Sequence, residues 1–272
     1  MLDQEPGRMS ISCEPESLPR SGGGNRAGAT KRKSHPVSTV IVVYIAVQTN
    51  ALFVHYANQF VSTYRQFQGG ANHKLIVCSN GGRLAPKMKA IFDPLPFAEF
   101  FERPNDEGWD ISAYQDVAKA YDCDLLVCFG ESVRFHRADW LARLVDCASE
   151  FGEGMYGCLS SHAIRPHLNT TAFAVSPRFL KQYPRVRNKA ERYHFEHGET
   201  SLWQGIVANG AQARLVTWDG CWGPGYWRTP ENILWRGDQS NCLVLCNHSD
   251  KYHGVDQQTR ERWAGRADGI LK

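Results

Sequence analysis

The sequence STVIVVYIAV, residues 38–47, is an uninterrupted run of mostly β-branched side chains. Such a run is typical of a strand that is buried on both faces of a sheet. It is followed by ALFVHYANQFVSTYRQF (residues 51–67), where aromatic residues recur at spacings of three and four and predict an amphipathic helix. HKLIVCSN (residues 73–80) then predicts a second strand. Strand, helix and strand at this spacing predict a parallel pair with a right-handed crossover.

Similar patterns continue along the chain and extend the predicted α/β sheet. The expected elements are an edge strand within residues 91–104, a helix at 111–122, a strand at 124–129, a helix from about Ala138, a short strand before Ser176-Pro177 with a helix after it, a helix ended by Asn209-Gly210 with a strand after it, and a last strand within residues 243–254 followed by a polar tail. Residues 1–36 are rich in Ser, Gly, Pro and charge and predict a disordered arm. The rest, residues 37–272, is expected to form one domain.

Composition excludes several classes of protein. The net charge is only +3, from 31 Lys and Arg against 28 Asp and Glu. The sequence also lacks a basic stripe interleaved with aromatic residues, the pattern that would predict nucleic-acid binding. The longest apolar run, Val40–Val47, is far shorter than the roughly 20 residues of a membrane-spanning helix. The polar N-terminus does not resemble a secretory signal, and nine scattered cysteines fit reduced thiols. We therefore expect a cytoplasmic protein, with membrane contact at most peripheral, at the inner membrane surface.

Polar residues follow the predicted parallel strands. Gln48–Asn50 follow the first strand, Ser79–Gly82 the second, and Gly130–Val133 the strand at 124–129. Ligands of open α/β sheets gather at the carboxyl ends of the strands. We therefore expect these three stretches to border one crevice.

The turn NDEGWDISAY, residues 105–114, brings Asn105, Gly108 and Asp110 close together ahead of the predicted helix. A glycine allows close approach of a ligand to the backbone, and carboxylate or amide groups beside it bind sugar or ribose hydroxyls. The alternative is that Asp110 only caps the helix.

This segment resembles the nucleotide-sugar-binding half of glycosyltransferases with the GT-A fold, in which an Asn-x-Gly turn precedes an apolar strand that carries a metal-binding Asp-x-Asp motif. Gly108–Tyr114 is also similar to the Gly-x-Asp-Ile-Gly-Ala turn of rhamnan-synthesis-type polysaccharide transferases. The resemblance covers about residues 37–250 and implies a donor half at 37–135 and an acceptor half at 136–272. The donor-binding residues that follow from it are Thr49, Asn50, Asn80, Asn105, Gly108, Asp110 and Glu131.

The resemblance also implies a divalent cofactor, Mg²⁺ or Mn²⁺, which bridges the donor diphosphate and prefers oxygen ligands. The chain departs from the motif here, because Gly130-Glu131-Ser132 offers one carboxylate where two are usual. Either Glu131 holds the metal with phosphates and water, with His248 or His253 as a further contact, or Arg, Lys and His side chains neutralise the diphosphate instead.

The segment FEHGETSLWQG, residues 195–205, resembles the Glu-Asp-x-x-Leu segment that supplies the catalytic base in inverting members. Inversion requires a carboxylate that accepts the proton of the attacking hydroxyl. Glu196 is the preferred candidate and Glu199 the second, with His197 as a substitute. Alternatively, both carboxylates only favour the positive end of a following helix.

Two polar or aromatic stretches are candidates for acceptor binding. SSHAIRPHLNTT, residues 160–171, is dense in hydrogen-bonding side chains, and TWDGCWGPGYW, residues 217–227, carries rings of the kind that stack on sugars. The candidates are His162, Arg165, His167, Asn169, Thr170, Trp218 and Trp222. Ordinary loop histidines and aromatic packing are the alternative interpretations.

Together these features predict a single GT-A-like, Rossmann-like α/β domain with a mostly parallel central sheet flanked by helices. Its expected function is transfer of a hexosyl or deoxyhexosyl group from a nucleoside-diphosphate sugar to a hydroxyl of a glycan or lipid-linked acceptor in polysaccharide biosynthesis. The alternative is a catalytically inactive nucleotide-sugar- or carbohydrate-binding module of the same fold, which the missing second acid at Ser132 favours. A dehydrogenase or hydrolase is less favoured, because neither G-x-G-x-x-G after the first strand nor G-x-S-x-G is present.

Overall fold

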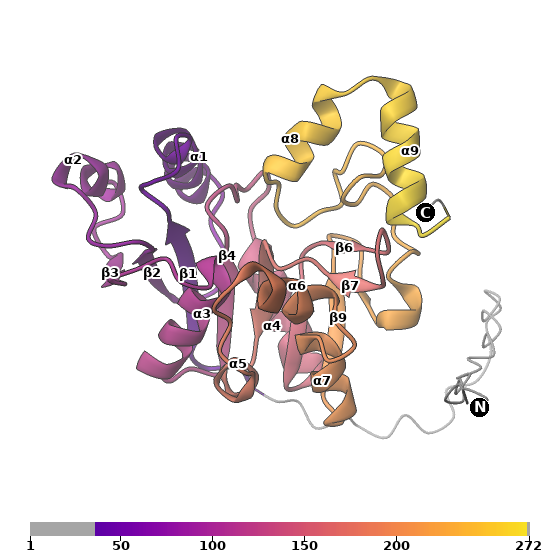
Figure 1. Ribbon diagram of the computed structural model, residues 1–272, viewed down its shortest axis with the longest axis horizontal. Coiled ribbons are helices and arrows are strands. Elements are labelled where there is room, and N and C mark those ends of the chain that lie inside the picture. Colours follow the sequence, from indigo (N-terminus) through magenta and orange to yellow (C-terminus); the bar gives the residue numbers. More distant parts are fainter. Residues whose placement is uncertain (1–35, 271–272) are drawn as a thin grey trace, which may run out of the picture. The chain divides into compact units, whose positions relative to one another are not determined.

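A computed structural model describes residues 36–270 of the chain, so all but the last residue of the predicted N-terminal arm lies outside the described part. The described residues form a mixed α/β domain around an eight-stranded sheet (Figure 1). The strand order is β10-β9-β5-β8-β4-β1-β2-β3. These strands are β1 (Val40–Ala46), β2 (Lys74–Ser79), β3 (Glu99–Glu102), β4 (Leu125–Phe129), β5 (Gly154–Gly157), β8 (Ala172–Val175), β9 (Gln212–Val216) and β10 (Cys221–Trp222).

The sheet is parallel where the sequence pattern is clearest. β1 pairs with β2 on one side and β4 on the other, and β2 pairs with β3, all in parallel. β5 and β9 are also parallel, whereas β8 lies antiparallel between β4 and β5, and β10 runs antiparallel to β9. The expected mostly parallel sheet is confirmed. The strand predicted before Ser176 is β8, and it connects the two parallel parts.

Helices cover both faces of the sheet. Phe129 of β4 packs its ring on Trp140, while Phe173 of β8 packs on Tyr114, with ring centroids 5.4 and 5.6 Å apart. Phe173 is the cross-strand partner of Cys128, so its side chain and that of Phe129 lie on opposite faces. The helices are α1 (Phe53–Gln66), α2 (Pro86–Lys89), η1 (Ala90–Phe92), α3 (Trp109–Ala120), α4 (Trp140–Phe151), α5 (Pro177–Gln182), α6 (Lys189–His197), α7 (Leu202–Ala208), η2 (Pro224–Tyr226), α8 (Asn247–Gly254) and α9 (Gln257–Ala267).

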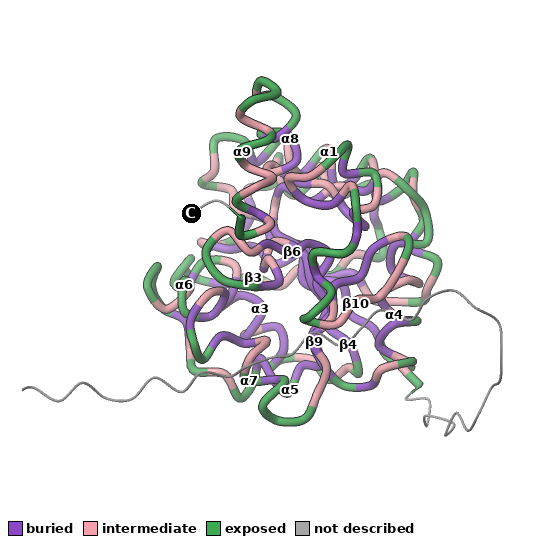
Figure 2. The backbone as a smooth tube through the Cα atoms, turned by 90° about the vertical axis from the view of Figure 1, so that its right-hand side faces the viewer, coloured by how far each residue is buried: buried purple, intermediate pink, exposed green. Residues whose placement is uncertain are grey.

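The apolar patterns form the core as expected. β1 and β4 are buried along their whole length, and the backbone of the sheet is largely buried while many connecting turns are exposed (Figure 2). Tyr44 of β1 stacks on Phe60 of α1 with ring centroids 3.9 Å apart. The aromatic spacing of residues 51–67 therefore places one face of α1 against the sheet.

The predicted strand within residues 243–254 was wrong. Leu245 and Cys242 each form only an isolated bridge, with Arg134 and Thr217, and residues 247–254 form α8. Cys242, Leu243, Val244 and Cys246 are buried although they form no strand, so an apolar run here indicates burial and not a strand. The expected polar tail contains α9, which packs against α8 (Figure 1).

Candidate functional site

The carboxyl ends of three parallel strands meet at one edge of the sheet. Asn50, which follows β1, donates a hydrogen bond from Nδ2 to Oε1 of Glu131, which follows β4. The backbone N–H of Asn80, after β2, donates to the carbonyl of Ala46 at 2.9 Å. These contacts bring the three strand ends close together.

A first cavity of about 440 Å³ opens at this edge. It contains residues that follow β1, β2 and β4, the start of α3, and two cationic residues of α6. Its lining residues are Ile45, Val47, Asn80, Trp109, Asp110, Gly130, Glu131, Lys189 and Arg192. Three of the predicted donor-binding residues, Asn80, Asp110 and Glu131, therefore lie together in this cavity.

Glu131 is a half-buried carboxylate at the floor of the site. Burial raises the pKa of its carboxyl, the negative charge of Asp110 adds to the rise, and the hydrogen bond from Asn50 opposes it. Oε2 of Glu131 is buried and has no partner among the described residues. One carboxylate oxygen is thus free to accept a hydrogen bond from a ligand.

Asp110 is not the cap of the helix that follows. The N-cap position of α3 is occupied by Gly108, and no side chain caps the helix there. Asp110 lies in the first turn and accepts hydrogen bonds from Nε and Nη2 of Arg192, at 3.0 and 3.3 Å. The carboxylate therefore joins α3 to α6 and faces the first cavity.

The other expected donor residues are placed differently. Gly108 has a φ of +67°, and a Cβ there would lie 2.0 Å from the carbonyl oxygen of Val186. The glycine is thus required by packing within the chain, whereas we expected it to admit a ligand. Thr49 and Asn105 are exposed and are not among the residues that line the first cavity, while Asn50 contacts the site through Glu131.

A second cavity, of about 250 Å³, adjoins the first, because Arg192 lines both. It combines the hairpin of β6 (Ser160–Ser161) and β7 (His167–Leu168) with the last turn of α6 and the start of α8. Its lining residues are Ser161, Ala163, Ile164, His167, Asn169, Thr171, Arg192, Glu196, His197, Leu234, Trp235 and His248. Predicted acceptor-binding and catalytic residues therefore share this cavity.

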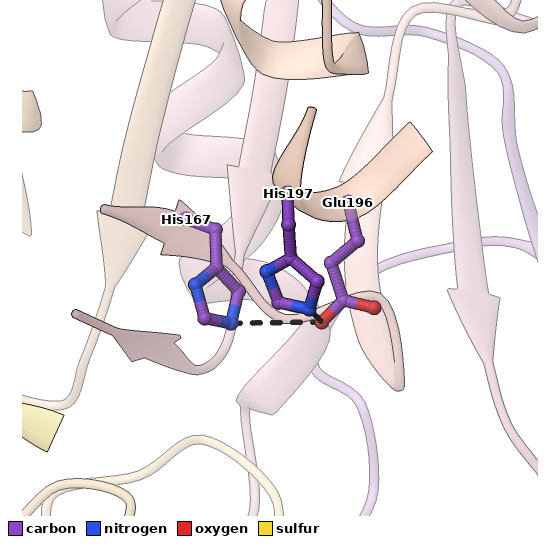
Figure 3. Close-up of side chains that lie close together, drawn as sticks. All are labelled: His167, Glu196 and His197. Carbon is purple, nitrogen blue, oxygen red and sulfur yellow. Dashed lines mark ion pairs between the residues drawn. The ribbon is translucent and has the colours of Figure 1, made fainter. Parts of the chain in front are cut away.

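Glu196 is the centre of the second cavity. Its Oε2 accepts a hydrogen bond from Thr170 at 2.8 Å and its Oε1 accepts one from Asn169 at 3.2 Å. Nε2 of His167 and Nε2 of His197 lie 3.6 and 3.9 Å from Oε1 (Figure 3). Burial lowers the pKa of both histidines, that of His197 to about 4, so both rings are neutral at pH 7.

Glu199, the second candidate base, lies outside this arrangement. Its carboxylate is exposed and pairs with Arg165 at 3.3 Å. His162 is half-buried, and burial lowers its pKa to about 4. Glu199, Arg165 and His162 are absent from the lining of the second cavity.

The aromatic candidates pack within the protein. The guanidinium of Arg137 lies over the ring of Trp218 at 4.5 Å, and Nε1 of Trp222 donates to Thr217 at 2.9 Å. Neither tryptophan lines the two cavities described above. The metal candidates are also apart, since Glu131 lines the first cavity and His248 the second.

Sequence reasoning missed the cationic side of the site. Lys189 and Arg192 come from α6, whose N-cap Asn188 accepts a hydrogen bond from the N–H of Glu191 at 3.0 Å. The carboxylate of Glu191 in turn accepts from the N–H of Arg187 at 2.6 Å. Asn-x-x-Glu is a signal for a helix start, and it would have placed Lys189 and Arg192 on one helix face.

Comparison with protein families and with curated proteins gives no match. Among solved structures, the galactosyltransferase LgtC, in complex with donor and acceptor sugar analogs, is similar over 58% of this chain and 71% of its own, with 12% identity and a TM-score of 0.42. The mannosyltransferase PcManGT from Pyrobaculum calidifontis, in complex with GDP-Man and Mn2+, is similar over 55% of this chain and 48% of its own, with 10% identity and a TM-score of 0.42. A cytidylyltransferase from Leptospira borgpetersenii is similar over 64% of this chain and 74% of its own, with 12% identity and a TM-score of 0.43. A function for this chain has to be derived from its own cavities.

Proposed function

We propose that this chain is a glycosyltransferase that moves a sugar from a nucleoside-diphosphate donor to a hydroxyl of a glycan or lipid-linked acceptor. The observation that carries the proposal is the pair of adjoining cavities that share Arg192. Group transfer requires that two substrates be held side by side in a fixed orientation. The first cavity binds the donor and the second binds the acceptor. The donor site is built from residues of the half at 37–135 together with residues of α6.

The first cavity suits a nucleotide sugar. Lys189 and Arg192 provide positive charge for a diphosphate, and Asp110 and Glu131 provide acceptors for ribose or sugar hydroxyls. The ring of Trp109 is 44% exposed and offers a flat surface for a base or a pyranose. Asn80 completes the polar lining.

The first cavity is poor in ligands for a metal that bridges the diphosphate. Its lining has two carboxylates, and that of Asp110 is paired with the cationic Arg192, which leaves Glu131. Mg²⁺ is usually held by one or two carboxylates together with phosphates and water, so Glu131 alone would be a weak anchor. We therefore assign neutralisation of the leaving diphosphate to Lys189 and Arg192.

Glu196 is the proposed general base. It would accept the proton of the acceptor hydroxyl while the hydroxyl oxygen bonds to the anomeric carbon and the nucleoside diphosphate leaves with the electrons of the broken bond. Asn169 and Thr170 hold the carboxylate in place, which favours a fixed geometry for proton transfer. This route inverts the anomeric centre.

We further propose that the enzyme transfers a hexosyl or deoxyhexosyl group in polysaccharide biosynthesis, as the resemblance to rhamnan-synthesis-type transferases implies. It would work in the cytoplasm, at the inner membrane surface. No helix among residues 36–270 has the length and apolar character needed to cross a bilayer. In this proposal a lipid-linked acceptor is met at the surface of the membrane.

The test is a thermal-shift screen with UDP-, GDP-, CDP- and dTDP-sugars, with and without EDTA, followed by assays for transfer and donor hydrolysis. Stabilisation by one donor that persists in EDTA supports the proposal, because a ligand stabilises the state that binds it. Binding without turnover for any acceptor would favour the inactive binding module. No binding of any nucleotide sugar would overturn the proposal.

A further inference from the structure

The trio His167, Glu196 and His197 has the composition and spacing of a metal site. Each residue offers one ligand atom, and the three atoms lie within 4.8 Å of one another. In Figure 3 the two imidazole rings and the carboxylate converge from β7 and the last turn of α6. We propose that this trio binds a divalent cation of the zinc class.

The hydrogen bonds of His167 determine which ring nitrogen carries the proton. Nδ1 of His167 lies 2.8 Å from the carbonyl oxygen of Arg165, which can only accept, so Nδ1 carries the hydrogen. In the neutral ring Nε2 then has a lone pair, and this lone pair faces the carboxylate of Glu196. Metal-binding histidines have this arrangement, since a backbone carbonyl commonly orients the ring that ligates.

Two of the three interatomic distances are close to those around a tetrahedral ion. Ligand atoms on a four-coordinate Zn²⁺ are separated by about 3.4 Å, given bond lengths of about 2.0–2.2 Å. The carboxylate oxygen of Glu196 lies 3.6 Å from Nε2 of His167 and 3.9 Å from Nε2 of His197. Shifts of side chains by less than an ångström would close these two gaps.

The surroundings support the same interpretation. Asn169 and Thr170 hydrogen-bond the carboxylate of Glu196, as outer partners of metal ligands do.

Two histidines and one glutamate form a three-ligand set that leaves a position open for water or a substrate oxygen. Imidazole nitrogen with one carboxylate favours zinc or a similar transition metal over Mg²⁺ or Ca²⁺. All three residues line the second cavity, so a ligand that enters it would reach the trio.

Cation binding at the trio and proton transfer to Glu196 exclude one another, because both use the same carboxylate. If the proposed function is correct, zinc inhibits transfer in competition with the acceptor. Cation binding itself depends only on the three side chains. A binding measurement therefore tests the metal site separately from the proposed function.

The experiment titrates Co²⁺, a coloured substitute for Zn²⁺, into the full chain prepared without a histidine tag and follows visible absorption, with Zn²⁺ as competitor. One equivalent should bind with the intense bands of four-coordinate cobalt, and Zn²⁺ should displace it. His167→Gln and His197→Gln should each weaken binding by at least about 10-fold. His194→Gln, on the exposed side of the same helix, and Glu131→Gln, in the first cavity, should leave binding unchanged.

Thermal melting in EDTA checks that each variant is folded. If His167→Gln does not fold, His197→Gln decides, because His197 is only partly buried and lies at the end of α6. Absence of cobalt binding by the unmodified chain, or binding that persists in a folded trio variant, would overturn the proposal.

Discussion

Arg192 of α6 donates two hydrogen bonds to the carboxylate of Asp110 in the first turn of α3, at 3.0 and 3.3 Å. The pair lies where the two cavities meet, since Arg192 lines both and Asp110 lines the first. The negative partner raises the pKa of Arg192 further, so its charge is permanent. A fixed cation at the boundary of two cavities suits a leaving diphosphate.

Arg192→Gln should lower the affinity for the nucleotide-sugar donor by about 10- to 100-fold, the effect of losing a hydrogen bond from a charged group. Calorimetric titration of the donor measures this change. Arg178→Gln is the matched control, because Arg178 pairs with Glu153 outside both cavities. Equal donor affinity in Arg192→Gln would remove this arginine from the donor site.

Glu196→Gln should abolish transfer while donor affinity stays within about twofold, because the amide preserves the shape of the side chain but cannot accept the proton. Turnover and donor binding are measured on the same preparation. Glu199→Gln should retain turnover, since that carboxylate is exposed and pairs with Arg165. Normal turnover of a folded Glu196→Gln variant would contradict the assignment of the base.

Gly108→Ala should destabilise the fold by about 2 kcal/mol or more, because the residue has φ +67° and its Cβ would collide with the carbonyl of Val186. Gly205→Ala in α7 is the matched control. A Cβ at Gly205 meets nothing within 4 Å, so alanine should stabilise the helix by about 0.5–1 kcal/mol. Denaturant unfolding measures both values, and equal effects would show that φ and packing at residue 108 are unimportant.

Asp124 should make stability depend on pH in the acid range. Its Oδ2 accepts hydrogen bonds from the N–H and hydroxyl groups of Ser38 and Thr39, which lower its pKa to about 2. Because the folded pKa lies below the unfolded value of about 3.9, the stabilisation is complete above about pH 4 and is lost as the pH falls through 2.

Asp124→Ala should therefore cost about 1 kcal/mol at pH 7, a modest value because the carboxylate is exposed and screened by solvent. Its unfolding free energy should approach that of the unmodified chain near pH 2. Asp122→Ala, a neighbouring exposed aspartate paired only with Lys181 at 3.3 Å, is the control. A difference that stays constant down to pH 2 would contradict the role of the ionised carboxylate.

The sequence predicted the parallel part of the sheet because its signals are local. The run at Val40–Ala46 and the aromatic spacing of α1 are each complete within one element, and the polar strand ends then meet as a consequence of parallel pairing. This reasoning placed Asn80 and Glu131 at one edge of the sheet, whereas Asp110 was expected there from its turn and from the resemblance.

The second cavity could be predicted only in part. Glu196 was singled out from the sequence, but α6 was missed because residues 184–194 show no apolar period. Glu196 was expected just before a helix, whereas it lies in the last turn of α6. His167 meets Glu196 only because β7 packs against α6, a contact between segments distant in the sequence. Trp218 and Trp222 resembled a sugar platform in sequence, yet their rings are engaged within the fold.

The antiparallel insertion of β8 between β4 and β5 has a consequence for synthesis of the chain on the ribosome. β4 ends at Phe129 and its partner β8 begins only at Ala172, so the buried strand LLVCF emerges well before the strand that covers its edge. At about 5–20 residues per second this edge stays unpaired for roughly 2–8 seconds. An apolar strand with an open edge pairs readily with other chains. The nascent protein therefore passes through an aggregation-prone interval after β4 has emerged and before β8 is complete.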